Sequence, residues 1–184
     1  MLPLTKRLLA NNLRTNVKRL TYIAKMLWGD STQFYTLIKI PKGQGKFRTV
    51  YRVAPGLKGL HSSIKTLLEN TVPATGTSYA YESGVRLADT ALRMHSHKLL
   101  VALDFKDHFT SVSMWQVTKL LEHHGAPSDV AFLIARLCCI TVGKRSFLPQ
   151  GSVVSPLLSN RVSEHLLDTA LKEAFPDSAI TRYS

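Results

Sequence analysis

The sequence lacks the features that mark disulfide-rich secreted proteins and membrane proteins. Its 184 residues include two cysteines, Cys138 and Cys139, which as neighbours form no Cys-x-x-Cys metal clip and rarely bond to each other. The longest apolar stretch, residues 131–142, carries Arg136 and is shorter than the roughly 20 residues that a membrane span requires. No zinc pattern, glycine-rich phosphate loop or nucleophilic triad signature occurs. These absences predict a globular protein of a reducing compartment, expected to be cytoplasmic, with no membrane partner.

Acidic residues are nearly absent from the first third of the chain. The formal net charge is +12, and residues 1–65 hold 13 Lys and Arg against one acid, Asp30, whereas residues 66–184 hold 11 basic and 11 acidic residues. A segment charged in this way binds phosphates, because their neutralisation releases condensed counterions. The charge therefore predicts nucleic acid as a partner. An anionic membrane surface, simple solubility and an organelle presequence are the alternatives.

The N-terminal segment, residues 1–33, is predicted to be helical and basic. Apolar residues recur at helical spacing over residues 5–27, which indicates one long amphipathic helix or two helices joined near Asn11 and Asn12. Five of its basic side chains are expected to contact nucleic acid: Lys6, Arg7, Arg14, Lys18 and Arg19.

The rest of the pattern mixes helices and strands, which predicts the α/β (α+β) class. Two β-rich runs, 34–40 and 47–53, flank a glycine-containing basic turn and so predict a hairpin. The apolar run 98–105 is typical of a central strand buried on both faces, although periodicity alone does not separate it from a buried helix. The other expected elements are helices at 57–68, 85–97, 113–123, 127–140 and 156–175 (Leu166 facing inward), a short hairpin at 141–148 and the start of a strand at 179–183.

Two carboxylates stand at the end of the apolar run. Asp104 ends it and Asp107 follows three residues later. Carboxylate oxygens at a strand end suit Mg²⁺, which prefers oxygen ligands. Taken alone, Asp104 is more often a helix or turn cap, and Phe109 is more often a core residue.

A second block changes that balance. It reads Leu148-Pro149-Gln150-Gly151-Ser152, followed by Ser155-Pro156-Leu157-Leu158-Ser159-Asn160. Proline and glycine around Gln150 fix a turn, and Ser155 can cap a helix whose first position suits Pro156. Together, the two blocks resemble a reverse transcriptase of the bacterial retron and group II intron type.

The resemblance covers residues 34–184 and implies a right-hand polymerase fold of fingers and partial palm, with no thumb. The fingers would comprise residues 34–97 and 113–148. The palm would comprise residues 98–112, with the strand that carries the first aspartate, and residues 149–184, with a helix and the start of a strand.

The resemblance also implies an activity, which is copying an RNA template into a DNA product from dNTPs with two Mg²⁺ ions. Asp104 would be the catalytic aspartate and a metal ligand, and the carbonyl of Phe105 would be a second ligand. Phe109 falls where the family has an aromatic steric gate against the 2′-hydroxyl. The expected nucleotide-binding residues are Lys42, Lys46, Arg48, Asp107, His108, Phe109 and Gln150, and further nucleic-acid contacts are expected at Gly151, Ser152, Ser155 and Asn160. For the three basic hairpin residues, a solvated edge hairpin is the alternative.

In this family the next motif is Tyr-x-Asp-Asp, and the sequence ends at Arg182-Tyr183-Ser184. This ending predicts that the chain alone is inactive. A second polypeptide carrying Asp-Asp and a thumb, or a missing C-terminal part, would complete the enzyme. The alternative is a catalytically inactive RNA-binding scaffold. The copied RNA, the priming mode and a role in antiviral defence or in mobility are not indicated by the residues.

Overall fold

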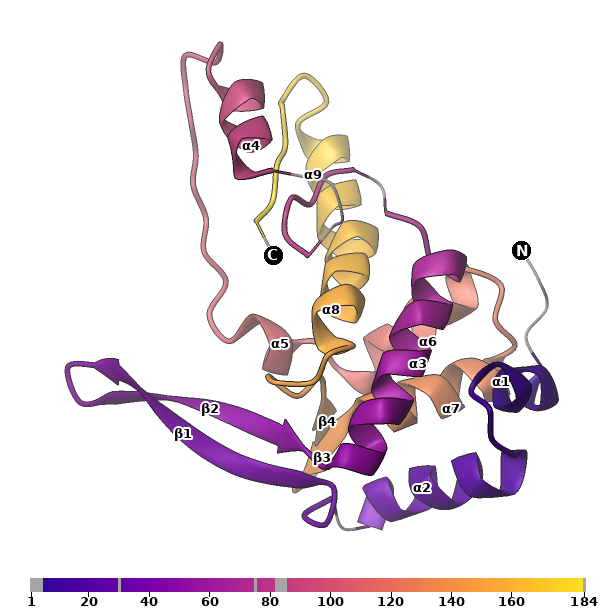
Figure 1. Ribbon diagram of the computed structural model, residues 1–184. Coiled ribbons are helices and arrows are strands. Elements are labelled where there is room, and N and C mark those ends of the chain that lie inside the picture. Colours follow the sequence, from indigo (N-terminus) through magenta and orange to yellow (C-terminus); the bar gives the residue numbers. More distant parts are fainter. Residues whose placement is uncertain (1–4, 30, 75, 82–85, 184) are drawn as a thin grey trace.

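The fold is a helical body from which a long β-hairpin extends (Figure 1). The computed structural model describes residues 5–29, 31–74, 76–81 and 86–183. Its elements confirm the expected mixture of helices and strands. They are α1 (Lys6–Asn12), α2 (Val17–Gly29), β1 (Tyr35–Gly43), β2 (Lys46–Val53), α3 (Pro55–Thr71), α4 (Leu87–Met94), α5 (His108–Ser111), α6 (Met114–His123), α7 (Ser128–Cys138), β3 (Ile140–Val142), β4 (Arg145–Phe147), α8 (Ser155–Ser163), the π-helical turn η1 (Glu164–Asp168) and α9 (Thr169–Ala174).

The N-terminal segment forms two helices, α1 and α2, which confirms the second of the two expected arrangements. Arg14 has a φ of 50°, in the left-handed region, so a continuous helix is interrupted there. The Asn16 side chain then accepts a 2.8 Å hydrogen bond from the amide of Arg19 in the first turn of α2. The inner face of α2, made of Leu20, Ala24 and Leu27, is buried.

The centre of the body is α7. Most of its side chains are buried, and it packs against α1, α2, α3 and α6. A helix that is apolar on nearly every side must be surrounded on every side, in contrast to the one-sided α2. Cys138 and Cys139 at its end are free and fully buried, and burial raises the pKa of both thiols.

Both expected hairpins are confirmed as separate two-stranded antiparallel sheets. In the longer hairpin, Tyr35 pairs with Val53 at the base and Gly43 pairs with Lys46 at the tip. The tip turns through positive φ angles at Gly43, Gln44 and Gly45. In the shorter hairpin, β3 pairs with β4.

The helix expected at 156–175 is confirmed, with one irregularity. The segments α8, η1 and α9 follow one another directly, so a π-turn interrupts the α-helical geometry. The helix expected at 85–97 is shorter, at Leu87–Met94, and its expected first residue, Val85, lies outside the described residues.

The strand expected over residues 98–105 is wrong. The segment is extended, but its backbone forms no strand pairing with any described residue. Its apolar side chains face solvent: Leu99, Leu100, Val101 and Leu103 are 66–80% exposed. The apolar pattern is correct for a buried strand, but a strand also needs neighbours that accept its backbone hydrogen bonds.

The strand expected at 179–183 is reduced to a single parallel bridge between Ser78 and Arg182. In the described part of the chain, no helix is long and apolar enough to cross a membrane.

Candidate functional site

The loop of residues 149–154 is held from two sides. The Tyr51 amide of β2 donates a 2.7 Å hydrogen bond to the Gln150 carbonyl. The Ser155 hydroxyl, at the start of α8, donates to the Pro149 carbonyl at 2.8 Å. Ser155 is fully buried, so its hydroxyl closes the turn from inside rather than facing a ligand. The loop therefore has a fixed position relative to the base of the β1–β2 hairpin.

Gly151 is the point of closest approach between the loop and β2. Its φ is +114°, which L-residues with side chains rarely adopt. A Cβ at this position would lie 2.7 Å from the Tyr51 carbonyl oxygen and 2.8 Å from Cγ1 of Val50. Position 151 therefore requires glycine for two independent reasons.

His61 of α3 anchors the other end of the loop. Its Nε2 lies 2.8 Å from the carbonyl oxygen of Leu137, and its Nδ1 lies 2.7 Å from the hydroxyl oxygen of Ser152. A carbonyl only accepts, so Nε2 carries the proton and Nδ1 accepts from Ser152. His61 is fully buried, and desolvation lowers its pKa to about 4. The imidazole is therefore neutral at physiological pH and serves as a bridge between α7 and the loop.

The segment of residues 104–109 leads from solvent into the body. Asp104 is exposed and Phe105 is 49% exposed. Asp107 has a φ of 54°, and its carbonyl accepts hydrogen bonds from the hydroxyls of Thr110 and Ser111, which closes the short α5 turn. Its own side chain stays exposed. The two carboxylates are thus available to a ligand.

His108 and Phe109 lie on α5 with their rings 5.7 Å apart and are half-buried. Burial, and then the positive charge of Arg182, lower the pKa of His108. Among the described residues its Nε2 has no hydrogen-bond partner. A neutral imidazole beside the segment that carries Asp104 is therefore expected.

The hairpin tip carries Lys42, Lys46 and Arg48, and all three are exposed. Figure 1 shows the β1–β2 hairpin and the extended segment before α5 reaching out on the same side of the molecule. Both segments are therefore open to one ligand from that side.

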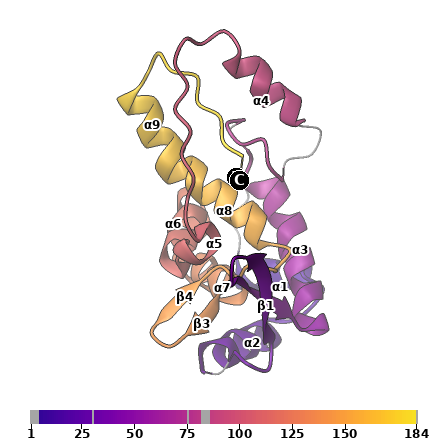
Figure 2. The same ribbon diagram turned by 90° about the vertical axis from the view of Figure 1, so that its left-hand side faces the viewer.

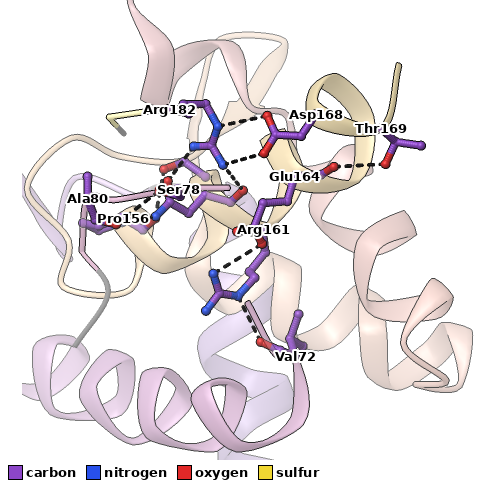
Figure 3. A network of polar contacts seen from close by, with 11 residues as sticks. Val72, Ser78, Ala80, Pro156, Arg161, Glu164, Asp168, Thr169 and Arg182 are labelled. Carbon is purple, nitrogen blue, oxygen red and sulfur yellow. Dashed lines mark hydrogen bonds and ion pairs between the residues drawn. The ribbon is translucent and has the colours of Figure 1, made fainter. Parts of the chain in front are cut away.

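Arg182 and Asp168 lie in a buried polar network (Figure 3), to which the buried Asn160 also belongs. The Asn160 Nδ2 donates to the Ala80 carbonyl at 2.7 Å, and its Oδ1 accepts from the guanidinium of Arg182 at 2.7 Å. Arg182 also donates from two nitrogens to the two carboxylate oxygens of Asp168, at 3.2 and 3.3 Å. The backbone of Arg182 pairs with the segment before α4 through Thr77 and Tyr79. Asn160 thus joins three segments of the chain.

A second buried pair extends this network. Arg161 donates to the Val72 carbonyl at 3.0 Å and to Glu164 at 3.4 Å. The two arginines of the network therefore fix α8 and η1 to the end of α3 and to the C-terminal segment.

Comparison with known proteins places these motifs in a family. The family model described as "Reverse transcriptase (RNA-dependent DNA polymerase)" matches residues 40–184. The chain belongs to the reverse transcriptase family. It is also 27% identical, over 167 residues, to "Retron Mx162 reverse transcriptase" of Myxococcus xanthus, a match that covers 83% of this chain. The chain spans 34%, about a third, of the length of that relative.

In this reverse transcriptase chain, the five basic residues expected to bind nucleic acid lie on α1, α2 and the turn between them. Arg7, Arg14, Lys18 and Arg19 are exposed. Lys6 differs, because it forms a 2.9 Å ion pair with Asp129 of α7. Four of the five side chains are therefore open to a phosphate without breaking an ion pair within the described residues.

The expected metal ligands fit Mg²⁺ in kind but not in number. The Asp104 carboxylate and the Phe105 carbonyl are oxygen donors of the type that Mg²⁺ takes. The described residues nevertheless bring no three His, Cys, Asp or Glu side chains together. The described chain alone therefore supplies only part of a metal site.

Three residues that hold the segments of the candidate site in place were not predicted as site residues: His61, Asp168 and Arg182. For His61 a signal exists, because a histidine on the apolar face of an amphipathic helix must be buried and hydrogen-bonded. Asp168 and Arg182 are well separated in the sequence, and no helical or strand spacing predicts that they form an ion pair. Ser152, Ser155 and Asn160 are expected nucleic-acid contacts that the structure places in buried hydrogen bonds, while Gly151 is exposed.

Proposed function

We propose that this chain forms the fingers and part of the palm of an RNA-directed DNA polymerase that copies an RNA template with dNTPs and Mg²⁺. The family match over residues 40–184 carries this proposal, because it includes both the Asp104 segment and the 149–160 block. The fixed loop at Gln150 and the exposed basic hairpin tip support it. Lys42, Lys46 and Arg48 bind the triphosphate, and Gln150 lines the nucleotide pocket. A cytoplasmic location is part of the proposal.

The active enzyme requires further residues that supply the Asp-Asp pair and a thumb, from a second polypeptide or from a C-terminal part. The segment 98–105 supports this requirement. Four apolar side chains there are 66–80% exposed, and its backbone has no strand partner among the described residues. An extended apolar segment with free backbone groups favours pairing with another strand. In this proposal, the added strand pairs with residues 98–105 and forms a sheet beside Asp104.

Magnesium is the proposed cofactor. Asp104 and the Phe105 carbonyl are the residues of this chain that hold it, and the bound metals supply charge stabilisation for nucleotidyl transfer. Asp107 and His108 lie beside this position, where the exposed Asp107 carboxylate and a neutral imidazole face the incoming nucleotide. Phe109 excludes a 2′-hydroxyl by its bulk.

Substitution of Asp104 tests the copying function. In the completed enzyme, Asp104→Asn is expected to abolish primer extension, because the amide loses the negative charge while keeping the shape. Binding of the RNA template, measured by fluorescence anisotropy, should be unchanged. Asp177→Asn is the matched control, since Asp177 is also exposed and lies outside the two motifs. If Asp104→Asn extends primers at the wild-type rate, the catalytic assignment is wrong.

Phe109→Ala tests the gate separately. Removal of the ring should admit ribonucleotides, which is measured as the ratio of kcat/KM for dNTP and NTP. An unchanged ratio would contradict the gating role while leaving the role of Asp104 intact. The competing function is an RNA-binding scaffold without catalytic activity. It would be favoured if the wild-type chain failed to extend primers with every second polypeptide or C-terminal part that supplies the Asp-Asp pair and a thumb.

A further inference from the structure

The outward face of α2 carries cations with no acid beside them in sequence. Its inner face, Leu20, Ala24 and Leu27, is buried against the body. Lys18 and Lys25 lie opposite that face, at positions where 3.6 residues per turn brings them together with Tyr22. Both lysines are exposed, and residues 5–29 contain no Asp or Glu. The face is therefore positively charged.

Tyr22 stands between these lysines as a flat, accessible ring. Its side chain is 62% exposed, and no other described ring or cation contacts it. Trp28 on the same helix differs, because the Arg136 guanidinium lies 4.6 Å from its ring centroid and Phe132 lies 6.2 Å away. Tyr22 is thus the aromatic side chain of α2 whose ring is free to stack on a ligand.

The combination fits single-stranded nucleic acid better than a lipid surface. A helix that binds a membrane inserts an apolar face, and the apolar face of α2 is already buried in the protein. A duplex hides its bases, whereas an unpaired strand offers both phosphates and base faces. The Tyr22 ring can stack on a base of an unpaired strand, and the two lysines beside it can bind the phosphates.

Helix α2 lies outside the segments that are expected to copy RNA. In both views α2 lies at the end of the molecule opposite to α4 and α9 (Figures 1 and 2). The two expected catalytic segments do not include it. An RNA strand bound on α2 would therefore contact residues other than those of the two expected catalytic segments.

We propose that the outward face of α2 docks unpaired RNA, with Tyr22 stacked on a base and with Lys18 and Lys25 on the flanking phosphates. The choice of RNA rests on the proposed function. The preference for an unpaired strand rests on the helix face alone. The surface holds an RNA segment on the enzyme through residues outside the two expected catalytic segments.

Fluorescence anisotropy with this chain tests the proposal, using a labelled unstructured RNA about 16 nucleotides long and the same RNA annealed to its complement. Tyr22→Ala should weaken binding of the single strand about fivefold or more and leave duplex binding nearly unchanged. Tyr22→Phe keeps the ring and should bind like the wild type. Lys18→Gln with Lys25→Gln should reduce the salt slope for the single strand by about 1.4, from about 0.7 for each charge.

Trp115→Ala is the matched control, because Trp115 is 64% exposed on α6, and it should bind RNA like the wild type. The proposal is overturned if Tyr22→Ala binds the single strand like the wild type, or if it weakens single-strand and duplex binding equally. It is also overturned if these substitutions weaken binding to phosphatidylcholine–phosphatidylserine vesicles while RNA binding is unchanged. No nucleotide is present in this assay, so a failed primer-extension test refutes the copying function without affecting this result.

Discussion

Replacement of Arg182 by methionine is expected to cost this protein a large part of its stability. The guanidinium makes two hydrogen bonds to Asp168 and two to Asn160, at 2.7–3.3 Å. The side chains of Arg182 and Asp168 are 8% and 2% exposed. Methionine fills a similar length without charge, so the Asp168 carboxylate would remain buried and uncompensated. Breaking a buried ion pair in this way costs about 3–5 kcal/mol.

Urea unfolding followed by circular dichroism measures this cost. With a slope of about 2 kcal/mol per molar urea, the midpoint of Arg182→Met should fall by about 1.5–2.5 M. Because whole domains are stable by about 5–15 kcal/mol, the variant should be measured at low temperature, where it remains folded. The double variant Arg182→Met with Asp168→Leu removes both charges and should recover part of the loss.

Lys119→Met provides the comparison for an exposed pair. The Lys119 Nζ and a Glu122 carboxylate oxygen lie 2.7 Å apart, with side chains 52% and 23% exposed, and solvent screening leaves such a pair little effect on stability. If Arg182→Met costs no more than Lys119→Met, the C-terminal segment is not held by the buried network. The absence of any recovery in the double variant would show that the loss comes from packing rather than from an uncompensated charge.

Two further substitutions test the 149–154 loop. Gly151→Ala should destabilise the protein by about 1–3 kcal/mol in a thermal unfolding assay, because of strain at φ +114° and contact with Tyr51. The control is Gly59→Ala, at an exposed helical site with no atom within 4 Å of the added Cβ, which should be neutral or stabilising. Equal effects of the two substitutions would contradict the close approach of Gly151 to β2. The pKa of His61 in the folded protein is about 4, below the ordinary value of 6.5. Protonation therefore favours the unfolded chain, and a contribution of about 3 kcal/mol to the free energy of unfolding, present above pH 6.5, is lost as the pH falls toward 4. His61→Gln, whose amide can replace both hydrogen bonds, should lose less stability than the wild type between pH 7 and pH 4, and an unchanged pH dependence would be evidence against a buried neutral His61.

The fold was largely predictable where local patterns determine structure. The glycines at the tip of the β1–β2 hairpin permit the positive φ angles that the turn adopts, and they predict the reversal correctly. Ser113 caps helix α6, because its hydroxyl accepts a 3.2 Å hydrogen bond from the Gln116 amide. The segment 98–105 was not predictable in the same way. Its pattern describes the environment in which a strand would be stable, and hydrogen-bond partners for that strand are absent from the described residues.

The candidate site shows the same division. Residue type and spacing identify Asp104 and Gln150 as members of two family motifs, but they give no indication of which polar side chains support them. Ser155 and Asn160 illustrate the problem, because a polar residue in a motif is equally compatible with a ligand contact and with a buried hydrogen bond. The three-dimensional structure places both in buried hydrogen bonds. Their contribution to the site is therefore to hold the loop and the helix in place.

The π-turn explains why the polar network could not be read from the helix pattern. In a regular α-helix, eight residues turn through about 800°, so Asp168 would lie about 80° away from the face of Asn160. A π-turn takes one extra residue into a turn, which returns Asp168 to within about 20° of that face. Both side chains then reach Arg182, and Leu166, which regular spacing predicts to face inward, is 46% exposed. The π-turn therefore buries the Asp168 carboxylate and leaves Leu166 partly exposed, and the ion pair with Arg182 offsets the cost of burying the charge of Asp168.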